Sequence, residues 1–341
     1  MMHVKRDFEV KLRKNEVVGP ALPIQENRLP LFQSRLALAT GRCQGELMKN
    51  EAREPKLLCN NRGVDFVKAL ADVEIKDLDL HISVPNTEDI VVLKGRPRCA
   101  TQQATQLKCG GMVVACTFSH QMAEAYSANM FLVSWAEMAL SKQHVRSNIS
   151  SAATLLANAD NGSSSSKRKM TKLEAFSAFL WKMIAAGEFN RTNKFYENQA
   201  KLIEPYFGNV LSIPFGEKNI EELKERPLSW IANEIHEFLE SAVTKEHFLG
   251  LIDWVEDHRP EPWLAKIYCS GPSEEEPTVV VSSGQHFPVK KMNFGWGEPC
   301  FGMYHFPWGG KSGYVMPMPS PKGNGDWIVY MHLLKGQLEL I

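Results

Sequence analysis

Residues 107–138 read LKCGGMVVACTFSHQMAEAYSANMFLVSWAEM, and this stretch decides the fold of the first half of the chain. Residues 112–118 are a short apolar run with two valines after a Gly-Gly pair, which is typical of a buried strand. Apolar residues then recur at helical spacing over residues 122–136. His120 therefore lies where a buried strand gives way to a helix. A side chain at such a junction can be held by both elements and still face a cavity.

A histidine in this position suits a general base. A neutral imidazole with a pKa near pH 7 can take a proton from a substrate hydroxyl and return it later. Two other interpretations stay open from the residues alone. His120 could simply pack at the end of a strand, or it could bind a metal together with Cys116 and Glu124, each four positions away. No HExxH motif and no CxxC-type pair supports the metal site.

The same stretch resembles the His-x-x-x-Asp block of the plant BAHD acyl-CoA-dependent acyltransferases. Further segments match family blocks in the expected order, and together they make the resemblance specific. They are FEVKLRKNEVVGPALPIQENRLPL (8–31), LLCNNRGVDFVKALADVEI (57–75), PYFGNVLSIPFG (205–216), SSGQHFPVKKMNFGWGEP (282–299) and GDWIVYMHLLKGQLELI (325–341). Within the family, the chain looks most like the shikimate O-hydroxycinnamoyltransferases and coniferyl alcohol acyltransferases of plant specialised metabolism.

The resemblance implies an α/β (α+β) fold with two similar sheet-plus-helix domains of the chloramphenicol-acetyltransferase type and a channel between them. It also implies that His120 deprotonates an alcohol acceptor, which attacks the acyl-CoA carbonyl directly without a covalent enzyme intermediate. The absence of a G-x-S-x-G elbow agrees with that mechanism. Acyl-CoA, carrying an aromatic hydroxycinnamoyl-type or a small acyl group, would be a co-substrate. No bound cofactor or metal is expected.

The second candidate site is the block Asn293, Phe294, Gly295, Trp296 and Gly297. Two glycines around a tryptophan let the backbone turn tightly and approach a neighbour closely. The family has Asp-Phe-Gly-Trp-Gly here, and the resemblance implies that this block shapes the cofactor channel. A glycine-rich turn with a packed tryptophan is the alternative. Asn293 in place of Asp removes a charge from a structural ion pair of the family.

Two further positions depart from the family pattern. Glu124 stands where the family has an Asp that pairs with an arginine and holds the histidine loop, so Glu124 is expected to support the catalytic loop. Arg191 is the only nearby arginine that could serve as its partner. His286 stands where members that use carboxylate-bearing acceptors often carry arginine. It is the candidate on the acceptor side, although imidazole lacks the permanent charge and the bidentate fork of arginine.

Two family segments look absent: a strand and helix between Leu31 and Glu46, and an Asp-x-Arg strand between Ala186 and Tyr206. The chain thus looks like a shortened copy. Together with Glu124 and Asn293, these gaps support a second hypothesis, a catalytically silent family member that binds a ligand or a partner.

The chain predicts two domains, 1–147 and 171–341, joined by a Ser/Gly-rich linker over 148–170 that contains NADNGSSSSKRK. The first domain carries His120 and the second carries the Asn-Phe-Gly-Trp-Gly block. Predicted elements include a strand–turn–strand over 57–66, a short helix over 66–73 and buried strands over 278–282 and 328–333. A capping box at Thr171 should start one helix, with Phe176, Phe179, Leu180, Met183 and Ile184 inward, and a further helix should span 228–243.

Composition excludes several classes of protein. The 341 residues are 44% hydrophobic and 23% charged, as in a globular protein. Basic and acidic residues number 39 each, so no global field favours nucleic acid or an anionic membrane. The charged N-terminus predicts no signal peptide, and no apolar run approaches the roughly 20 residues of a membrane span. Seven scattered cysteines indicate a reducing compartment, and we expect a cytoplasmic monomer.

Overall fold

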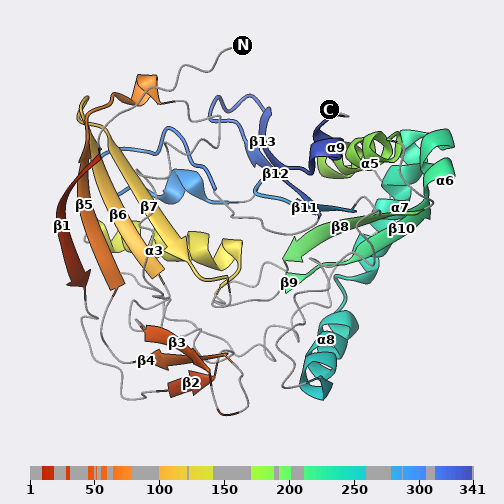
Figure 1. Ribbon diagram of the computed structural model, residues 1–341, viewed down its shortest axis with the longest axis horizontal. Coiled ribbons are helices and arrows are strands. Elements are labelled where there is room, and N and C mark those ends of the chain that lie inside the picture. The colour runs from red at the N-terminus through yellow and green to blue at the C-terminus, as the bar shows by residue number, and fades with distance from the viewer. Residues whose placement is uncertain are drawn as a thin grey trace. The chain divides into compact units, whose positions relative to one another are not determined.

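The computed structural model forms two compact units. The described residues are 10–18, 28–30, 45–49, 51, 55–59, 64–78, 100–120, 123–140, 170–187, 192–200, 211–258, 278–285, 287–304 and 312–339. Unit 1 is Met1–Ile149, Glu204–Asn209 and Pro288–His305, and unit 2 is Ser150–Ile203, Val210–Phe287 and Phe306–Ile341. Each unit combines β-sheet with helices (Figure 1), which confirms the mixed α/β class.

Unit 1 is built on a four-stranded sheet in the order β1-β5-β6-β7. Its strands are β1 (Val10–Val18), β5 (Val64–Ala71), β6 (Ala100–Leu107) and β7 (Met112–Phe118). β5 and β6 run parallel, whereas β6 and β7 form an antiparallel hairpin. A smaller sheet joins β2 (Arg28–Pro30), β4 (Pro55–Cys59) and β3 (Gly45–Lys49), and two 3₁₀ turns, η1 (Ile75–Asp77) and η3 (Val289–Lys291), complete the unit.

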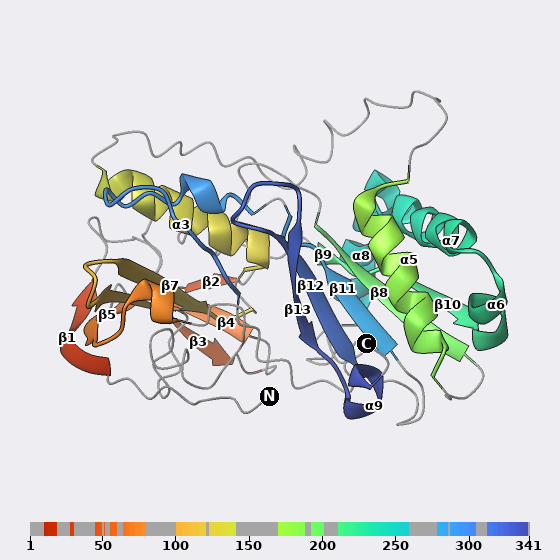
Figure 2. The ribbon, with the colours of Figure 1, turned by 90° about the horizontal axis from the view of Figure 1, so that it is seen from above.

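Helix α3 (Ala125–Ala139) covers one face of the four-stranded sheet (Figure 2). Two edge-to-face aromatic contacts hold it there. Phe66 of β5 meets Trp135, with ring centroids 6.0 Å apart, and Phe118 of β7 meets Phe131 at 5.5 Å. Such pairs stabilise packing beyond the area they bury. The helix is therefore anchored to the strand that leads into His120.

Unit 2 is built on a sheet in the order β10-β8-β11-β12-β13, with β9 paired to β8. The strands are β8 (Thr192–Ala200), β9 (Leu211–Ser212), β10 (Phe215–Asn219), β11 (Thr278–Ser282), β12 (Gly313–Pro319) and β13 (Trp327–His332). The helices are α5 (Lys172–Ala185), α6 (Ile220–Glu225), α7 (Leu228–Ser241), α8 (Lys245–Asp257) and α9 (Lys335–Leu338).

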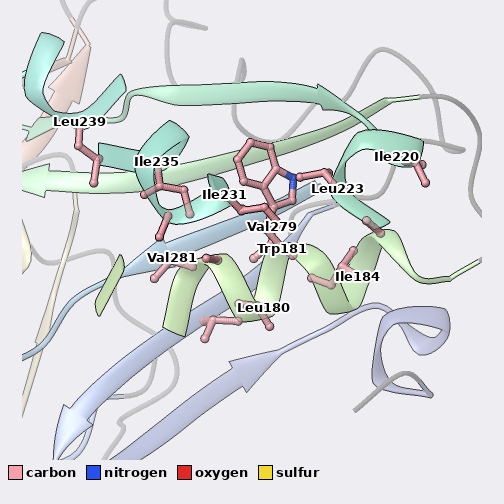
Figure 3. Close-up of a cluster of buried hydrophobic side chains, with 14 residues drawn as sticks. Leu180, Trp181, Ile184, Ile220, Leu223, Ile231, Ile235, Leu239, Val279 and Val281 are labelled. Atoms are coloured by element: carbon pink, nitrogen blue, oxygen red, sulfur yellow. The ribbon is translucent and has the colours of Figure 1, made fainter. Parts of the chain in front are cut away.

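The core of unit 2 lies between its sheet and the two helices α5 and α7 (Figure 3). Trp181 of α5 is fully buried there, as is Ile231 of α7. Val279 and Val281 of β11 complete this layer from the sheet side. A largely aliphatic core of this kind is what the helical and strand periodicities of the second half predict.

Several predicted elements of unit 2 are confirmed. β11 has the predicted bounds, and β13 and α7 differ from theirs by one or two residues. The Thr171 capping box is present, because the Thr171 side chain accepts from the Glu174 amide while the Glu174 side chain accepts from the Thr171 amide. One predicted inward residue of α5 was wrong, since Phe179 is 50% exposed and Trp181 fills the core instead.

The predicted helix over residues 66–73 was wrong, because residues 66–71 belong to β5 and residues 72–73 form a bend after it. Asp65, Val67 and Ala69 are buried while Lys68 is exposed, which is the alternation of a strand. Pairing with β1 on one edge and β6 on the other overrides the helix propensity of the Ala-Leu-Ala run. The predicted strand–turn–strand over 57–66 has both of its strands, in β4 and β5, although these belong to different sheets, and the predicted turn at 60–63 lies outside the described residues.

The two apparent gaps have different outcomes. After Ala186 a strand does follow, β8, although its nine residues TNKFYENQA contain no Asp-x-Arg sequence. Residues 31–44, where the first gap falls, lie outside the described residues, as do residues 148–169 of the predicted linker, Arg191 and His286.

The Asn-Phe-Gly-Trp-Gly block lies in unit 1, because residues 288–305 cluster with the N-terminal part of the chain. The sequence predicts that the block belongs to the C-terminal domain, because it comes late in the chain. The chain returns to unit 1 at Pro288 and leaves it again after His305, so sequence order alone misassigns the segment. Among the helices that the structure describes, none is both long and apolar enough to cross a bilayer.

Candidate functional site

His120 lies in the turn that follows β7, two positions after the strand ends at Phe118. The Phe118 ring packs on Phe131 of α3, so the strand end is held against the helix. His120 is exposed. The structure thus places an accessible imidazole at the strand-to-helix junction.

Glu124 caps the N-terminus of α3. Its carbonyl accepts the first helical hydrogen bond, from the Ala128 amide at 3.0 Å. Its carboxylate accepts from the Tyr126 amide at 2.6 Å and from the Ser127 amide at 2.7 Å, and the Ser127 hydroxyl donates to it at 2.6 Å. These amides are among the donors that an α-helix leaves unsatisfied, and a negative charge there is favoured by the helix dipole.

Glu124 is buried, and burial raises the pKa of its carboxyl above the ordinary value. The Ser127 hydroxyl, the Tyr126 and Ser127 amides and the charge of His120 all act in the opposite direction and lower this pKa. Glu124 therefore holds the start of the helix that begins five positions after His120.

A second pair of side chains meets on the same helix. Asn129 is completely buried, and its Nδ2 donates to the Ala125 carbonyl at 2.7 Å. The Tyr304 hydroxyl donates to Asn129 Oδ1. Burial raises the pKa of Tyr304, so its hydroxyl keeps its proton and remains a donor at physiological pH. Neither residue was predicted, although a polar Asn inside an apolar helical stretch is a signal that could have found Asn129.

The Asn-Phe-Gly-Trp-Gly block is a tight turn fastened to α3. Asn293 Oδ1 accepts from the Gly295 amide at 2.8 Å, and Gly295 has φ +103°, a conformation that favours glycine. The Phe294 ring meets Trp135 of α3 edge to face, with centroids 4.8 Å apart. Trp296 stacks beside Phe294 at 6.1 Å and is 63% exposed. Phe294 thus anchors the turn, and Trp296 faces solvent.

A shallow pocket lies between this turn and the end of α3. Its volume is about 230 Å³, and it is lined by Glu137, Leu140, Lys290, Lys291, Asn293 and Glu298. Two lysines and two glutamates give its rim no net charge. Charge alone therefore selects no ligand for it.

The metal alternative gains no support. In the described part of the chain, no group of three or more His, Cys, Asp or Glu side chains could hold a metal ion. Glu124 directs both carboxylate oxygens to its own helix.

Comparisons with known proteins agree on one family. The model of a family described as "Transferase family" matches residues 43–165 and 155–341. The chain is 25% identical to (Z)-3-hexen-1-ol acetyltransferase of Arabidopsis thaliana, over 85% of this chain and 76% of the relative. It is 24% identical to omega-hydroxypalmitate O-feruloyl transferase of the same plant, over 71% of this chain and 65% of the relative. Putrescine hydroxycinnamoyltransferase 3 of Oryza sativa subsp. japonica is 22% identical, over 86% of this chain and 81% of the relative.

Solved structures show the same fold. Vinorine synthase aligns with a TM-score of 0.66 and 13% identity, over 98% of this chain and 97% of its own. TRI101 of F. sporotrichioides, complexed with coenzyme A and T-2, aligns with a TM-score of 0.68 and 13% identity, over 90% of this chain and 86% of its own. The predicted chloramphenicol-acetyltransferase-like fold is thereby confirmed.

Proposed function

The chain belongs to the Transferase family, that of the plant BAHD acyltransferases, and from this premise we propose that it moves an acyl group from acyl-CoA to an alcohol, with His120 as the general base. The observation that carries the proposal is the exposed imidazole of His120 beside a helix N-terminus that Glu124 caps. A general base must be accessible to its substrate, and the capped helix beside His120 supports its placement.

The proposed reaction needs no covalent enzyme intermediate. His120 takes the proton of the acceptor hydroxyl as the acceptor oxygen bonds to the thioester carbonyl carbon. The carbon–sulfur bond then breaks, and the proton held by His120 passes to the departing thiolate of coenzyme A. Glu124 contributes indirectly, because its carboxylate caps the helix that follows the His120 turn and holds the first turn of that helix in place.

The acyl-CoA is proposed to pass close to the Asn-Phe-Gly-Trp-Gly turn, where the exposed ring of Trp296 offers an apolar contact. Relatives are named for acetyl, feruloyl and hydroxycinnamoyl transfer, and for alcohol or amine acceptors. We favour an aromatic or a small acyl group and an alcohol acceptor. His286, the acceptor-side candidate, is the residue to vary if a carboxylate-bearing acceptor such as shikimate is used.

Purified protein tests the proposal. Acetyl-CoA and feruloyl-CoA would each be paired with (Z)-3-hexen-1-ol, coniferyl alcohol, shikimate and putrescine, and released coenzyme A would be measured as free thiol. Saturable, acceptor-dependent release with an alcohol supports the proposal. Release of coenzyme A with putrescine alone would mean that the acceptor is an amine and not an alcohol. Binding of acyl-CoA by calorimetry without any release would instead favour the silent family member, for which Glu124 and Asn293 are the motivating departures.

A further inference from the structure

We infer that Tyr304 is a positioning residue for His120 and acts through Asn129 and the first turn of α3. This inference rests on the proposed role of His120 as base. It adds a contribution from a segment that follows the Asn-Phe-Gly-Trp-Gly turn.

The first step is the orientation of the Asn129 amide. A buried amide group needs partners on both its oxygen and its nitrogen. The Tyr304 hydroxyl supplies a proton to the oxygen, and this leaves the NH₂ group directed at the Ala125 carbonyl, 2.7 Å away. Without the tyrosine hydroxyl, the amide could rotate and exchange its two ends. Tyr304 therefore decides which end of Asn129 faces the helix N-terminus.

The second step runs from Ala125 to the base. Ala125 is the first residue of α3, and Glu124 directly precedes it. Asn129 holds the carbonyl of this turn, while Glu124 holds the Tyr126 and Ser127 amides of the same turn. Both sets of bonds hold the first turn of α3, the helix that begins five positions after His120. A shift of about 1 Å in a catalytic group can cost a factor of about 100 in rate.

A second contact prevents α3 from sliding or rotating along the sheet. Phe294 meets Trp135 near the other end of the helix, at 4.8 Å. Residues 293–304 therefore contact α3 at two places, Trp135 and Asn129, which lie about 9 Å apart along the helix axis. A helix held at both points keeps its N-terminal turn in register with the end of β7.

The test compares Tyr304→Phe with Tyr330→Phe, each of which removes one buried hydroxyl. Tyr330 lies on β13, and its hydroxyl has no hydrogen-bond partner among the described residues, so its loss should change little. We expect Tyr304→Phe to lower kcat by about tenfold with an unchanged KM for acyl-CoA, and to lower Tm more than Tyr330→Phe does, because the buried Asn129 oxygen loses its donor. Unchanged kcat would overturn the inference, as would a loss of acyl-CoA binding.

The double variant His120→Ala/Tyr304→Phe separates positioning from general weakening of the fold. If Tyr304 acts through His120, its substitution should leave the residual rate of His120→Ala unchanged. A further fall in that rate would contradict the inference. Wild-type protein without turnover on any donor and acceptor would defeat the proposed function, and this inference with it. Normal turnover that depends on His120 but is indifferent to Tyr304→Phe would defeat the inference alone.

Discussion

The Glu124 carboxylate accepts three hydrogen bonds from the first turn of α3, whereas the family pattern predicts an ion pair with an arginine at this position. Aspartate is the better N-cap in general, because its short side chain reaches the backbone amides with little loss of entropy. Glu124 spans the longer path and still reaches both the second and third amides of α3. The extra methylene is thus accommodated at the helix N-terminus, and the substitution does not by itself argue for a silent protein.

Removing the Glu124 carboxylate should loosen the start of α3. Glu124→Ala leaves the Tyr126 and Ser127 amides without their acceptor, and we expect a loss of about 1–2 kcal/mol in the free energy of unfolding. Glu124→Asp should retain most of the stability. Urea denaturation of the three proteins would measure this, and an alanine variant as stable as wild type would contradict the capping role.

The stability of the protein should also depend on pH through Glu124. Its pKa is raised in the folded state from an ordinary value of 4.5, so the folded chain binds a proton that the unfolded chain has released. The stability contributed by this group is therefore present below pH 4.5 and is lost as pH rises through the folded-state pKa. Glu124→Gln cannot titrate, so the stability of wild type relative to this variant should fall over that window and then become constant. A difference that rises with pH would contradict the assigned direction.

The sequence located His120 and Glu124, because both belong to one short motif and act within one turn. Asn129 and Tyr304 escaped prediction, since they meet across 175 positions of the chain. Local patterns report periodicity and turn chemistry but not which distant segment supplies a partner. A buried polar residue on an apolar helix face indicates that a partner exists without naming it.

At the scale of single elements, a lysine of α5 caps the C-terminus of α6. Lys182 of α5 donates through Nζ to the carbonyls of Leu223 at 3.0 Å, Lys224 at 2.7 Å and Arg226 at 2.6 Å. An ammonium group at a helix C-terminus satisfies orphan carbonyls and complements the helix dipole. All three of its donors are used, which makes this link between α5 and α6 hard to replace.

Lys182→Met should therefore destabilise unit 2. Methionine keeps the aliphatic length and removes the charged donors, so we expect a cost of about 1–3 kcal/mol. Lys224→Met is the matched control, since Lys224 is exposed on α6. Chemical denaturation followed by tryptophan fluorescence would report the change, and equal stability of the two variants would argue against the cap.

Two glycines of unit 2 give opposite expectations. A Cβ on Gly216 of β10 would lie 2.8 Å from the Phe238 ring and 3.0 Å from the Trp181 ring, so Gly216→Ala should cost about 1–3 kcal/mol through overpacking. Gly250 lies within α8 with no neighbouring atom within 4 Å of the added carbon. Gly250→Ala should stabilise by about 0.5–1 kcal/mol. Thermal denaturation should shift Tm in opposite directions, and a stabilising Gly216→Ala would show that β10 is less tightly packed than described.

β5 shows why elements are harder to predict than motifs. VDFVKALA contains good helix formers, and a short window cannot exclude a helix. The strand forms because β1 and β6, distant in sequence, pair with both of its edges. By contrast, the Thr171 capping box and β11 were predictable, because a cap and an unbroken valine run are decided locally.

At the scale of the whole molecule, each unit has its own sheet, and the chain passes between the units several times. His120, Glu124, Asn129 and the Asn-Phe-Gly-Trp-Gly turn all belong to unit 1. The segment 288–305 follows most of unit 2 in the sequence and still belongs to unit 1. It brings Tyr304 to Asn129, 175 positions earlier in the chain.

Direct transfer predicts that the enzyme is never acylated. Intact-mass measurement after incubation with acyl-CoA and no acceptor should show the mass of the unmodified chain. Cys109 requires a control, because it is exposed and its pKa is lowered by hydrogen bonds from the Ile75 and Gly111 amides. A low-pKa thiol can react with a thioester without any catalytic meaning. An acyl adduct that persists in Cys109→Ser would contradict direct transfer.

The most direct test of the central claim is the acceptor-dependent rate of coenzyme A release by His120→Ala. The matched control is His258→Ala, since His258 is also exposed but lies at the end of α8, where its Nδ1 bonds to the Trp254 carbonyl. Removing a general base should lower kcat by about 10²–10⁴-fold, whereas the control should keep the wild-type rate. A His120→Ala variant that releases coenzyme A within about twofold of the wild-type rate would contradict the assignment of His120 as the base.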